Sequence, residues 1–244
     1  MSLARFALRG AALAAALAGL SGCVTTMQKN ARTLLLNQRT LASETAVRVL
    51  RENPSVRVLG VAVVRVGGEA ALAVRLANTS DRPLTDLPIS VGIRTPAGRR
   101  VYLNAATGGA YYDAHLAAIG PREVTTWVCT VRALPGAAGH PFALVGRPHL
   151  PASTTARQLP AVGATLRALD GGVARALVVN RSGIPQFGLQ VYAVELDGSR
   201  VVGAARDTVA ELDGGARTTV SLHLVGGSRG TQQVHVYVLP TIFA

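Results

Sequence analysis

From residue 55 to the end of the chain, apolar and other residues tend to alternate with a period of two. The clearest run covers residues 56–66, reads Val-Arg-Val-Leu-Gly-Val-Ala-Val-Val-Arg-Val, and is closed by two glycines. Alternation over short runs between Gly, Pro, Asn and Asp predicts strands of antiparallel sheet. Further strands are predicted at 70–77, 85–94, 99–104, 123–132 and 141–147, with a loop at 105–115.

The chain repeats this pattern once. Leu-Ala-Asn-Thr-Ser at 76–80 is answered by Val-Val-Asn-Arg-Ser at 178–182, and Thr125-Thr126 by Thr218-Thr219. A repeat of roughly one hundred residues is the size of one immunoglobulin-type sandwich. We therefore expect an all-β protein of two tandem immunoglobulin-like antiparallel β-sandwiches. The predicted units are sandwich 1 at 55–148, a proline-containing linker at 149–160, and sandwich 2 at 161–244.

Before residue 55 the pattern is different. Between residues 26 and 52, apolar residues such as Met27, Ala31 and Leu34 recur at spacings of three and four, as on one face of a helix. Asn53-Pro54 ends this pattern. The segment 23–54 is thus either a helical or a flexible tether, and the pattern leaves both open.

The first residues have the layout of an export signal. Two arginines, Arg5 and Arg9, precede the apolar stretch 11–20, which is too short for a transmembrane helix of about 20 residues. The segment ends in Leu20-Ser21-Gly22-Cys23, which resembles the lipobox of bacterial lipoproteins. The alternative is a plain signal peptide followed by a coincidental cysteine.

The lipobox resemblance implies where the protein is located and how it is attached there. Residues 1–22 would be removed as a signal peptide, and Cys23 would carry a lipid that holds the chain in the membrane of the bacterial cell envelope. Val24 stands where an inner-membrane retention signal would usually have Asp. In a host with two membranes, the resemblance therefore implies the outer membrane, with the protein facing the periplasm.

A second resemblance concerns the modules. The order of a strand, an Asn-x-Ser turn, a Leu-containing strand, an x-Gly turn and a Thr-Thr strand looks like FxLYD and related immunoglobulin- or fibronectin-like modules of bacterial envelope proteins. It covers most of 56–150 and 162–240. The resemblance implies the fold and export, and these modules have no common activity to carry over.

The charge limits the class of partner. The formal net charge is +12, and Lys29 is the one lysine among 25 basic residues. The arginines are scattered, with Arg99-Arg100 the only adjacent pair, and no basic segment with interleaved aromatics occurs. We expect no nucleic-acid partner. Positive charge favours an anionic envelope polymer by long-range attraction, and an envelope protein is the other expected partner.

The sequence shows no catalytic pattern, so we expect a protein that is not an enzyme and needs no cofactor. Cys129 has no partner cysteine in the mature chain and lies in a strand-like run, which favours a buried, inert thiol. Gly226-Gly227-Ser228-Arg229-Gly230 fits G-x-S-x-G, but a strand follows and no acid comes later. This string is therefore interpreted as a hairpin turn.

No metal site is expected either. The histidines lack ligand spacing and have no cysteines clustered with them. His223 and His235 lie on consecutive predicted strands, where we expect a cross-strand pair on a solvated face.

The loop 105–115 is the candidate binding site. It contains Tyr111, Tyr112, Asp113 and His115 after a Gly-Gly pair. Loops on rigid sandwiches tend to carry binding residues, and tyrosine provides contact area at low entropic cost. The alternative is that the two tyrosines begin a strand or cover the end of the sandwich. The expected function is a non-catalytic envelope lipoprotein that binds or scaffolds another component, or an accessory subunit of an envelope enzyme or export complex.

Overall fold

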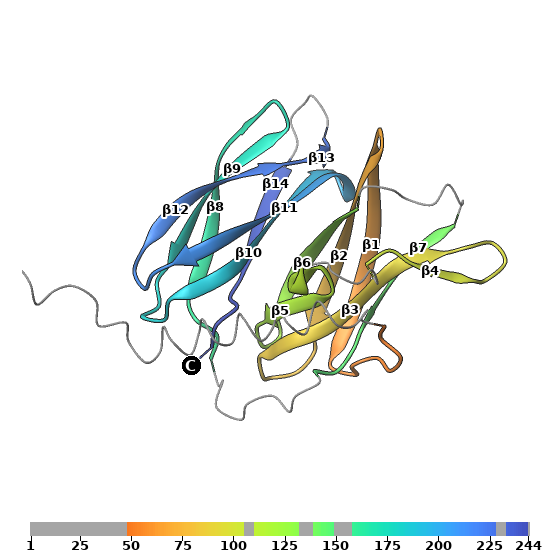
Figure 1. The fold of residues 1–244 in the computed structure, drawn as a ribbon, viewed down its shortest axis with the longest axis horizontal. Helices are drawn as coiled ribbons and strands as arrows, with labels where there is room; N and C mark the ends of the chain where they lie inside the picture. The colour runs from red at the N-terminus through yellow and green to blue at the C-terminus, as the bar shows by residue number, and fades with distance from the viewer. Residues whose placement is uncertain (1–47, 105–109, 132–138, 149–157, 228–232, 244) are drawn as a thin grey trace, which may run out of the picture.

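The computed structural model describes residues 48–104, 110–131, 139–148, 158–227 and 233–243 (Figure 1). The predicted signal peptide, Cys23 and most of the predicted tether and linker lie outside these ranges. Residues 48–54 of the predicted tether are described, and they contain no helix. Instead, Glu52 forms an antiparallel bridge with Gly146 of the first sandwich.

The first half forms an antiparallel sandwich. Its strands are β1 (Val56–Val66), β2 (Glu69–Asn78), β3 (Leu84–Arg94), β4 (Arg100–Tyr102), β5 (His115–Ile119), β6 (Val124–Val131) and β7 (His140–Val145). One sheet has the order β1-β2-β6; in the other, β3 lies between β7 on one side and β4 and β5 on the other. Leu72 and Trp127 of the first sheet and Ile89 and Leu116 of the second are fully buried in the core. The predicted strands are confirmed to within a few residues, and β5 is an additional one.

The second half has the same arrangement. Its strands are β8 (Val162–Asp170), β9 (Val173–Asn180), β10 (Gln186–Asp197), β11 (Arg200–Leu212), β12 (Arg217–His223), β13 (Val225–Gly226) and β14 (Gln233–Leu239). The sheets have the orders β12-β9-β8 and β13-β11-β10-β14. The long strand β11 takes the place that β4 and β5 share in the first half. The all-β, immunoglobulin-like sandwich fold expected from the sequence is thus what the structure has.

The two Asn-x-Ser turns make the same hydrogen bonds. Asn78 donates from Nδ2 to the carbonyl oxygens of Arg82 at 2.7 Å and Gly120 at 2.8 Å. Asn180 donates likewise to Ile184 at 2.8 Å and Asp213 at 3.1 Å. In both turns the serine hydroxyl donates to the asparagine Oδ1 at 2.7 Å. Each asparagine therefore ties the turn after the second strand of its sandwich to the turn before the Thr-Thr strand.

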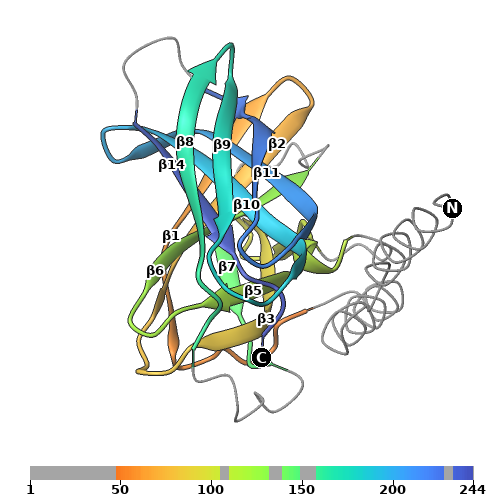
Figure 2. The same ribbon diagram turned by 90° about the vertical axis from the view of Figure 1, so that its left-hand side faces the viewer.

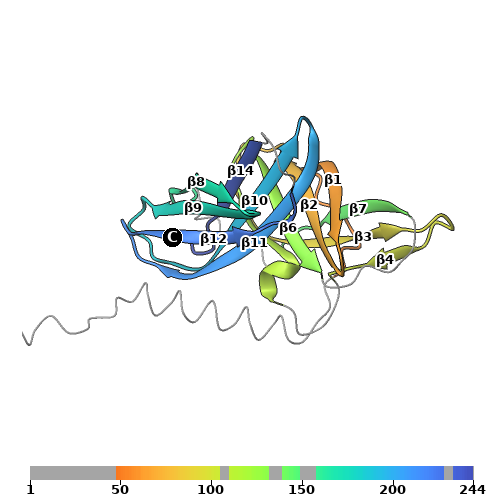
Figure 3. The ribbon, with the colours of Figure 1, turned by 90° about the horizontal axis from the view of Figure 1, so that it is seen from above.

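The sandwiches pack face to face and share a core. One face of sheet β13-β11-β10-β14 covers β8-β9-β12 through Val191, Ala193 and Ala205. Its other face contributes Tyr192 and Val194 to the core of the first half, where β11 and β13 lie against β1 and β2. Figure 3 shows the resulting layers in succession, from β8, β9 and β12 on the left to β3, β4 and β7 on the right.

Candidate functional site

The predicted binding residues do not form an exposed loop. Tyr111–Asp113 form a 3-10 helix, and His115 begins strand β5. Tyr112 and His115 are buried, with 6% and 5% of their surface exposed, whereas Tyr111 and Asp113 are half-buried. The expectation that these residues lie on an exposed loop is therefore corrected, because the 3-10 helix folds them against the first sandwich, and Arg206 of the second half contacts Tyr112 and Asp113. Residues 105–109 of the predicted loop lie outside the described ranges.

Tyr111 is fixed by a polar contact and by stacking. Its hydroxyl donates a hydrogen bond of 2.5 Å to Oδ1 of Asp86. Its ring stacks on that of His115 with centroids 3.9 Å apart and planes 4° apart. Burial, and then the nearby Asp86 carboxylate, raises the pKa of Tyr111 well above its usual range, so the phenol remains a hydrogen-bond donor. This arrangement suits a structural tyrosine.

Asp86 has an unusual backbone. It has a φ of 54° at the position between Thr85 and Leu87 where the pairing of β3 with β5 is interrupted, and Gly188 has a φ of 62° at the same place in the second repeat. Glycine adopts this left-handed region readily, whereas other residues do so seldom. The first sandwich has Asp instead of Gly there, and its carboxylate is the one that holds Tyr111.

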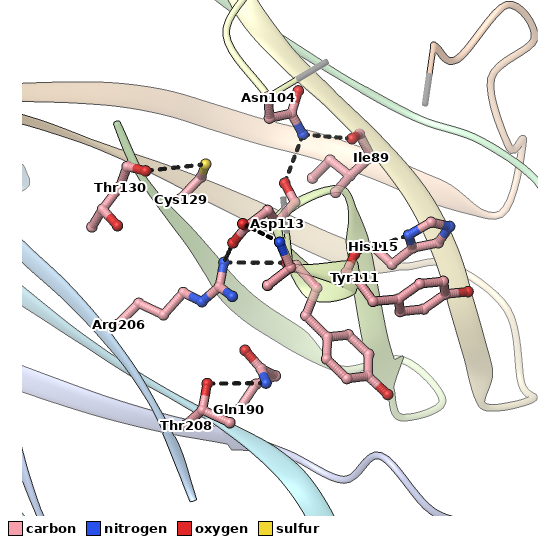
Figure 4. Close-up of polar contacts among 12 residues, drawn as sticks. Ile89, Asn104, Tyr111, Asp113, His115, Cys129, Thr130, Gln190, Arg206 and Thr208 are labelled. Atoms are coloured by element: carbon pink, nitrogen blue, oxygen red, sulfur yellow. Dashed lines mark hydrogen bonds and ion pairs between the residues drawn. The ribbon is translucent and has the colours of Figure 1, made fainter. Parts of the chain in front are cut away.

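Asp113 joins the two halves of the chain. Its carboxylate accepts from the Arg206 guanidinium of β11 and, through Oδ2, from the backbone N–H of Ala110 at 2.9 Å (Figure 4). Asn104 donates to the carbonyl oxygens of Asp113 at 2.9 Å and Ile89 at 2.8 Å. The Arg206 side chain is only 10% exposed. These residues form a junction cluster, defined as Asn104, Asp113 and Arg206, which fixes the 3-10 helix between the sandwiches.

Cys129 lies beside this cluster and is buried, as predicted. Burial and the nearby Asp113 charge raise the pKa of its thiol to about 12, although Arg206 acts in the opposite direction. Tyr192 of β10 is fully buried at the same junction, and its burial raises its pKa well above the usual range. Both groups therefore stay protonated at neutral pH, and a protonated thiol is a poor nucleophile.

The sequence analysis missed Asp86, Asn104 and Arg206. The sequence gives only weak evidence that Asp86 and Asn104 belong to the site, because Asp and Asn are frequent wherever a turn is needed. Arg206 follows two buried alanines on its strand, and an arginine amid buried small residues often has a buried partner. The identity of that partner depends on how the sandwiches dock.

The predicted histidine pair does not form. His223 pairs with Val173 on sheet β12-β9-β8, whereas His235 pairs with Val194 on the other sheet of the sandwich. Consecutive strands of a sandwich often belong to different sheets, so the order of strands along the chain does not show which of them are neighbours. Among the described residues, no group of three His, Cys, Asp or Glu side chains could hold a metal ion.

The glycine-rich string after β13 is not a hairpin turn. β13 pairs with β11 and β14 pairs with β10, so these strands occupy opposite edges of the sheet. The connection therefore crosses from one edge to the other. Residues 228–232, which include Ser228, lie outside the described part of the chain, and the strand expected after them is β14.

A small cavity of about 150 Å³ opens where the two halves meet the end of the predicted linker. Its lining is mostly apolar and includes Leu159, Pro160 and Pro240. The acidic residue, Glu123, already accepts a 2.5 Å hydrogen bond from the Gly120 backbone.

In the part of the chain that the structure describes, no helix has the length and apolarity needed to cross a membrane.

Comparison with known proteins identifies no family. No protein-family model matches the chain, and no curated protein sequence matches it. The solved structures similar to it include the C-terminal globular domain of an oligosaccharyltransferase from Pyrococcus abyssi (9% identity, TM-score 0.26, 82% of this chain and 51% of that one). They also include red sea bream transglutaminase (13% identity, TM-score 0.24, 79% of this chain and 29% of that one). The matches thus span about half or less of those proteins and are too distant to indicate a function.

Proposed function

We propose that the chain is a non-catalytic lipoprotein of the bacterial cell envelope that binds or scaffolds another envelope component. The lipobox-like Leu20-Ser21-Gly22-Cys23 supports the location in the cell envelope and the lipid anchor. The observation that carries the scaffold role is the shared core, in which Tyr192 and Val194 of the second sandwich pack with the first. Two sandwiches locked in this way present surfaces at a fixed distance and orientation.

The environment of the reactive groups supports a structural role for them. Tyr111 is bound to Asp86, Asp113 to Arg206, and the Cys129 thiol is kept protonated by burial. The first two pairs hold segments that are distant in the sequence. Catalytic groups, in contrast, are commonly tuned toward the working pH and open to a substrate.

The proposed partner binds on exposed sheet faces, because the tyrosines of the 3-10 helix are engaged inside. The positive net charge favours a partner with negative charge, either an envelope protein or an anionic envelope polymer. The alternative is an accessory subunit of an envelope enzyme or export complex, which the same rigid body would suit.

Fatty-acid labelling tests the anchor. The natural chain should incorporate a labelled fatty acid and sediment with membranes, whereas Cys23→Ala should do neither. Cys129→Ala is the matched control and should be labelled normally. Labelling that persists in Cys23→Ala would contradict the proposal. Chemical cross-linking followed by purification then separates the two roles, because an accessory subunit yields one protein complex of fixed stoichiometry.

A further inference from the structure

One outer surface of the first sandwich brings aromatic rings and arginines together. Gly92 of β3 pairs with Tyr102 of β4 on one side and with Phe142 of β7 on the other. The two rings meet edge to face over the glycine, with centroids 5.5 Å apart. A Cβ on Gly92 would lie 2.8 Å from two carbons of the Phe142 ring. The absence of a side chain at Gly92 therefore allows this aromatic pair.

Cations surround the pair. Arg100 lies over the Phe142 ring at 5.6 Å, and Arg48 lies over the Tyr102 ring at 5.5 Å. In the next row of the sheet, Arg94 pairs with Arg100 on one side and His140 on the other. We call this surface the arginine–aromatic face; its residues are Arg48, Arg94, Arg100, Tyr102, His140 and Phe142.

The charges of this face are not balanced within the described part of the chain. None of its arginines forms an ion pair there, and all three are exposed. Cations directly opposite each other on neighbouring strands repel and destabilise a sheet. A row in which Arg94 faces Arg100 is therefore unfavourable on its own, and an anionic ligand would relieve the repulsion.

The N-terminal segment reaches the body on this same face. The backbone N–H of Val49 donates to Ser90 Oγ at 2.9 Å, and Ser90 and Gly92 point to the same side of β3. Arg48 follows Cys23 by 25 residues in the sequence. Even fully extended, that stretch spans only about 85 Å, and a helix of the same length spans about 37 Å. A lipid on Cys23 would hold this face near the bilayer.

We propose that the arginine–aromatic face lies against anionic phospholipid headgroups of the membrane that anchors the chain, an inference that rests on the proposed lipid anchor. Guanidinium groups bind phosphate oxygens through paired hydrogen bonds. Tyrosine is favoured at the boundary between headgroups and hydrocarbon. A lipid anchor combined with a basic surface gives two attachments, which hold a protein on a membrane more firmly than one.

Vesicle binding tests the proposal without the anchor. The mature chain from residue 23 with Cys23→Ser, which carries no lipid, is sedimented with phosphatidylcholine vesicles that contain or lack phosphatidylglycerol. We expect binding to the anionic vesicles alone, weakening as salt is raised because salt screens exposed charges. The triple variant Arg48→Gln, Arg94→Gln, Arg100→Gln should bind at least about tenfold more weakly.

The outer face of sheet β8-β9-β12 supplies a matched control. Arg175, Arg181 and Arg217 are exposed there, and their triple substitution by Gln changes the net charge by the same amount. β8 and β9 face the viewer in Figure 2. This control should lose less than about threefold in binding, because its arginines lie on the sheet farthest from the anchored face. Equal loss in both triple variants would overturn the proposal.

Two further outcomes also count against it. One is failure to bind anionic vesicles, and the other is binding to dextran sulfate in preference to vesicles, which would assign the face to an anionic polymer. Both triple variants must keep the melting temperature of the natural chain. If the first does not, Arg48→Gln, which lies outside the strands, replaces it, with Arg181→Gln as its control. Fatty-acid labelling at Cys23 reports on the anchor alone, so either proposal can fail while the other stands.

Discussion

Arg206 pairs with Asp113, and the two residues belong to different sandwiches 93 positions apart in the chain. The pair stands at the edge of the shared core, where β11 of the second half meets the 3-10 helix of the first. Apolar packing supplies most of the contact, and the ion pair fixes which part of one sandwich faces which part of the other.

A double-mutant cycle should detect this coupling. Removing one partner of a buried ion pair costs about 3–5 kcal/mol. The Asp113 side chain is 39% exposed, so solvent screening reduces the expected loss for Asp113→Ala to about 2 kcal/mol. Arg206→Ala and the double variant complete the cycle, measured by chemical denaturation. Arg200→Ala breaks the exposed pair with Asp197 and should change stability by less than about 0.5 kcal/mol. Strictly additive effects of Asp113→Ala and Arg206→Ala would exclude the coupling.

The asparagines of the two repeats should matter equally. Asn78→Ala and Asn180→Ala each leave buried carbonyl oxygens without their donor, and we expect each to lower the free energy of unfolding by about 2–3 kcal/mol. Asn180→Asp should be worse at pH 7 than at pH 3, because a carboxylate cannot donate to a carbonyl oxygen. Denaturation curves at both pH values measure this. A loss in only one repeat would show that the turns are not equivalent.

Tyr112 is expected to be a stability residue. Tyr112→Ala should lower the free energy of unfolding by about 3–5 kcal/mol, the usual range for a buried aromatic. Tyr111→Phe keeps the stacking on His115 and loses only the bond to Asp86, so we expect a loss of about 1.5–3 kcal/mol. Partner recovery is measured on the same variants. Reduced recovery at unchanged stability would restore the binding-loop interpretation.

Alkaline pH should destabilise the protein. The folded state keeps the Cys129 thiol protonated up to about pH 12, whereas an unfolded thiol ionises near 8.5. The stabilisation of the folded state that comes from the protonated Cys129 thiol is therefore fully present below about pH 8.5. It is lost as the pH rises toward 12. Tyr111 and Tyr192, whose pKa values are also raised, act in the same direction at higher pH.

Thiol chemistry gives a direct check on Cys129. In the lipid-free chain with Cys23→Ser it is the remaining cysteine. A thiol reagent at pH 8 should modify it only as fast as the protein opens, and the rate should rise with denaturant. The Cys129→Ala variant should show a weaker loss of melting temperature between pH 8.5 and 10. Rapid modification of the native chain would contradict the burial.

Cutting the linker should not separate the sandwiches. Trypsin can cleave after Arg157, in the predicted linker. Because Tyr192, Val194 and Ala204 pack in the core of the first half, we expect two fragments on a denaturing gel that elute together on a native sizing column. Elution of two separate fragments would mean that the shared core is too weak to hold the halves.

Strand positions could be predicted from the sequence where one face of a strand is polar. The sequence of β1 alternates clearly, and its predicted range, 56–66, is the one observed. β5 was missed because its residues, His115 to Ile119, are all buried and therefore show no alternation. The same packing buries Tyr112 and His115, two of the residues that were expected to form an exposed binding loop.

The sequence of β2 indicates the junction between the sandwiches. β2 contains the continuous run Ala70 to Val74, and such runs are typical of strands buried on both faces. Comparison of the repeats gives the same indication. The apolar pair Ala73 and Val128 of the first half corresponds to the polar pair Arg175 and Ser221 of the second, so this face is covered only in the first half. The partner of Arg206, in contrast, depends on the docking of two rigid bodies, which local patterns do not encode.

The face-to-face packing is heterologous, since the three-stranded sheet of one repeat meets the four-stranded sheet of the next. Contacts of this kind do not close on themselves, and matching surfaces at the two ends would let copies add without limit into a filament. Here the end surfaces carry like charge: Arg94 and Arg100 on the first sandwich, and Arg175 and Arg217 on the second. Electrostatic repulsion between the ends therefore opposes the addition of further copies.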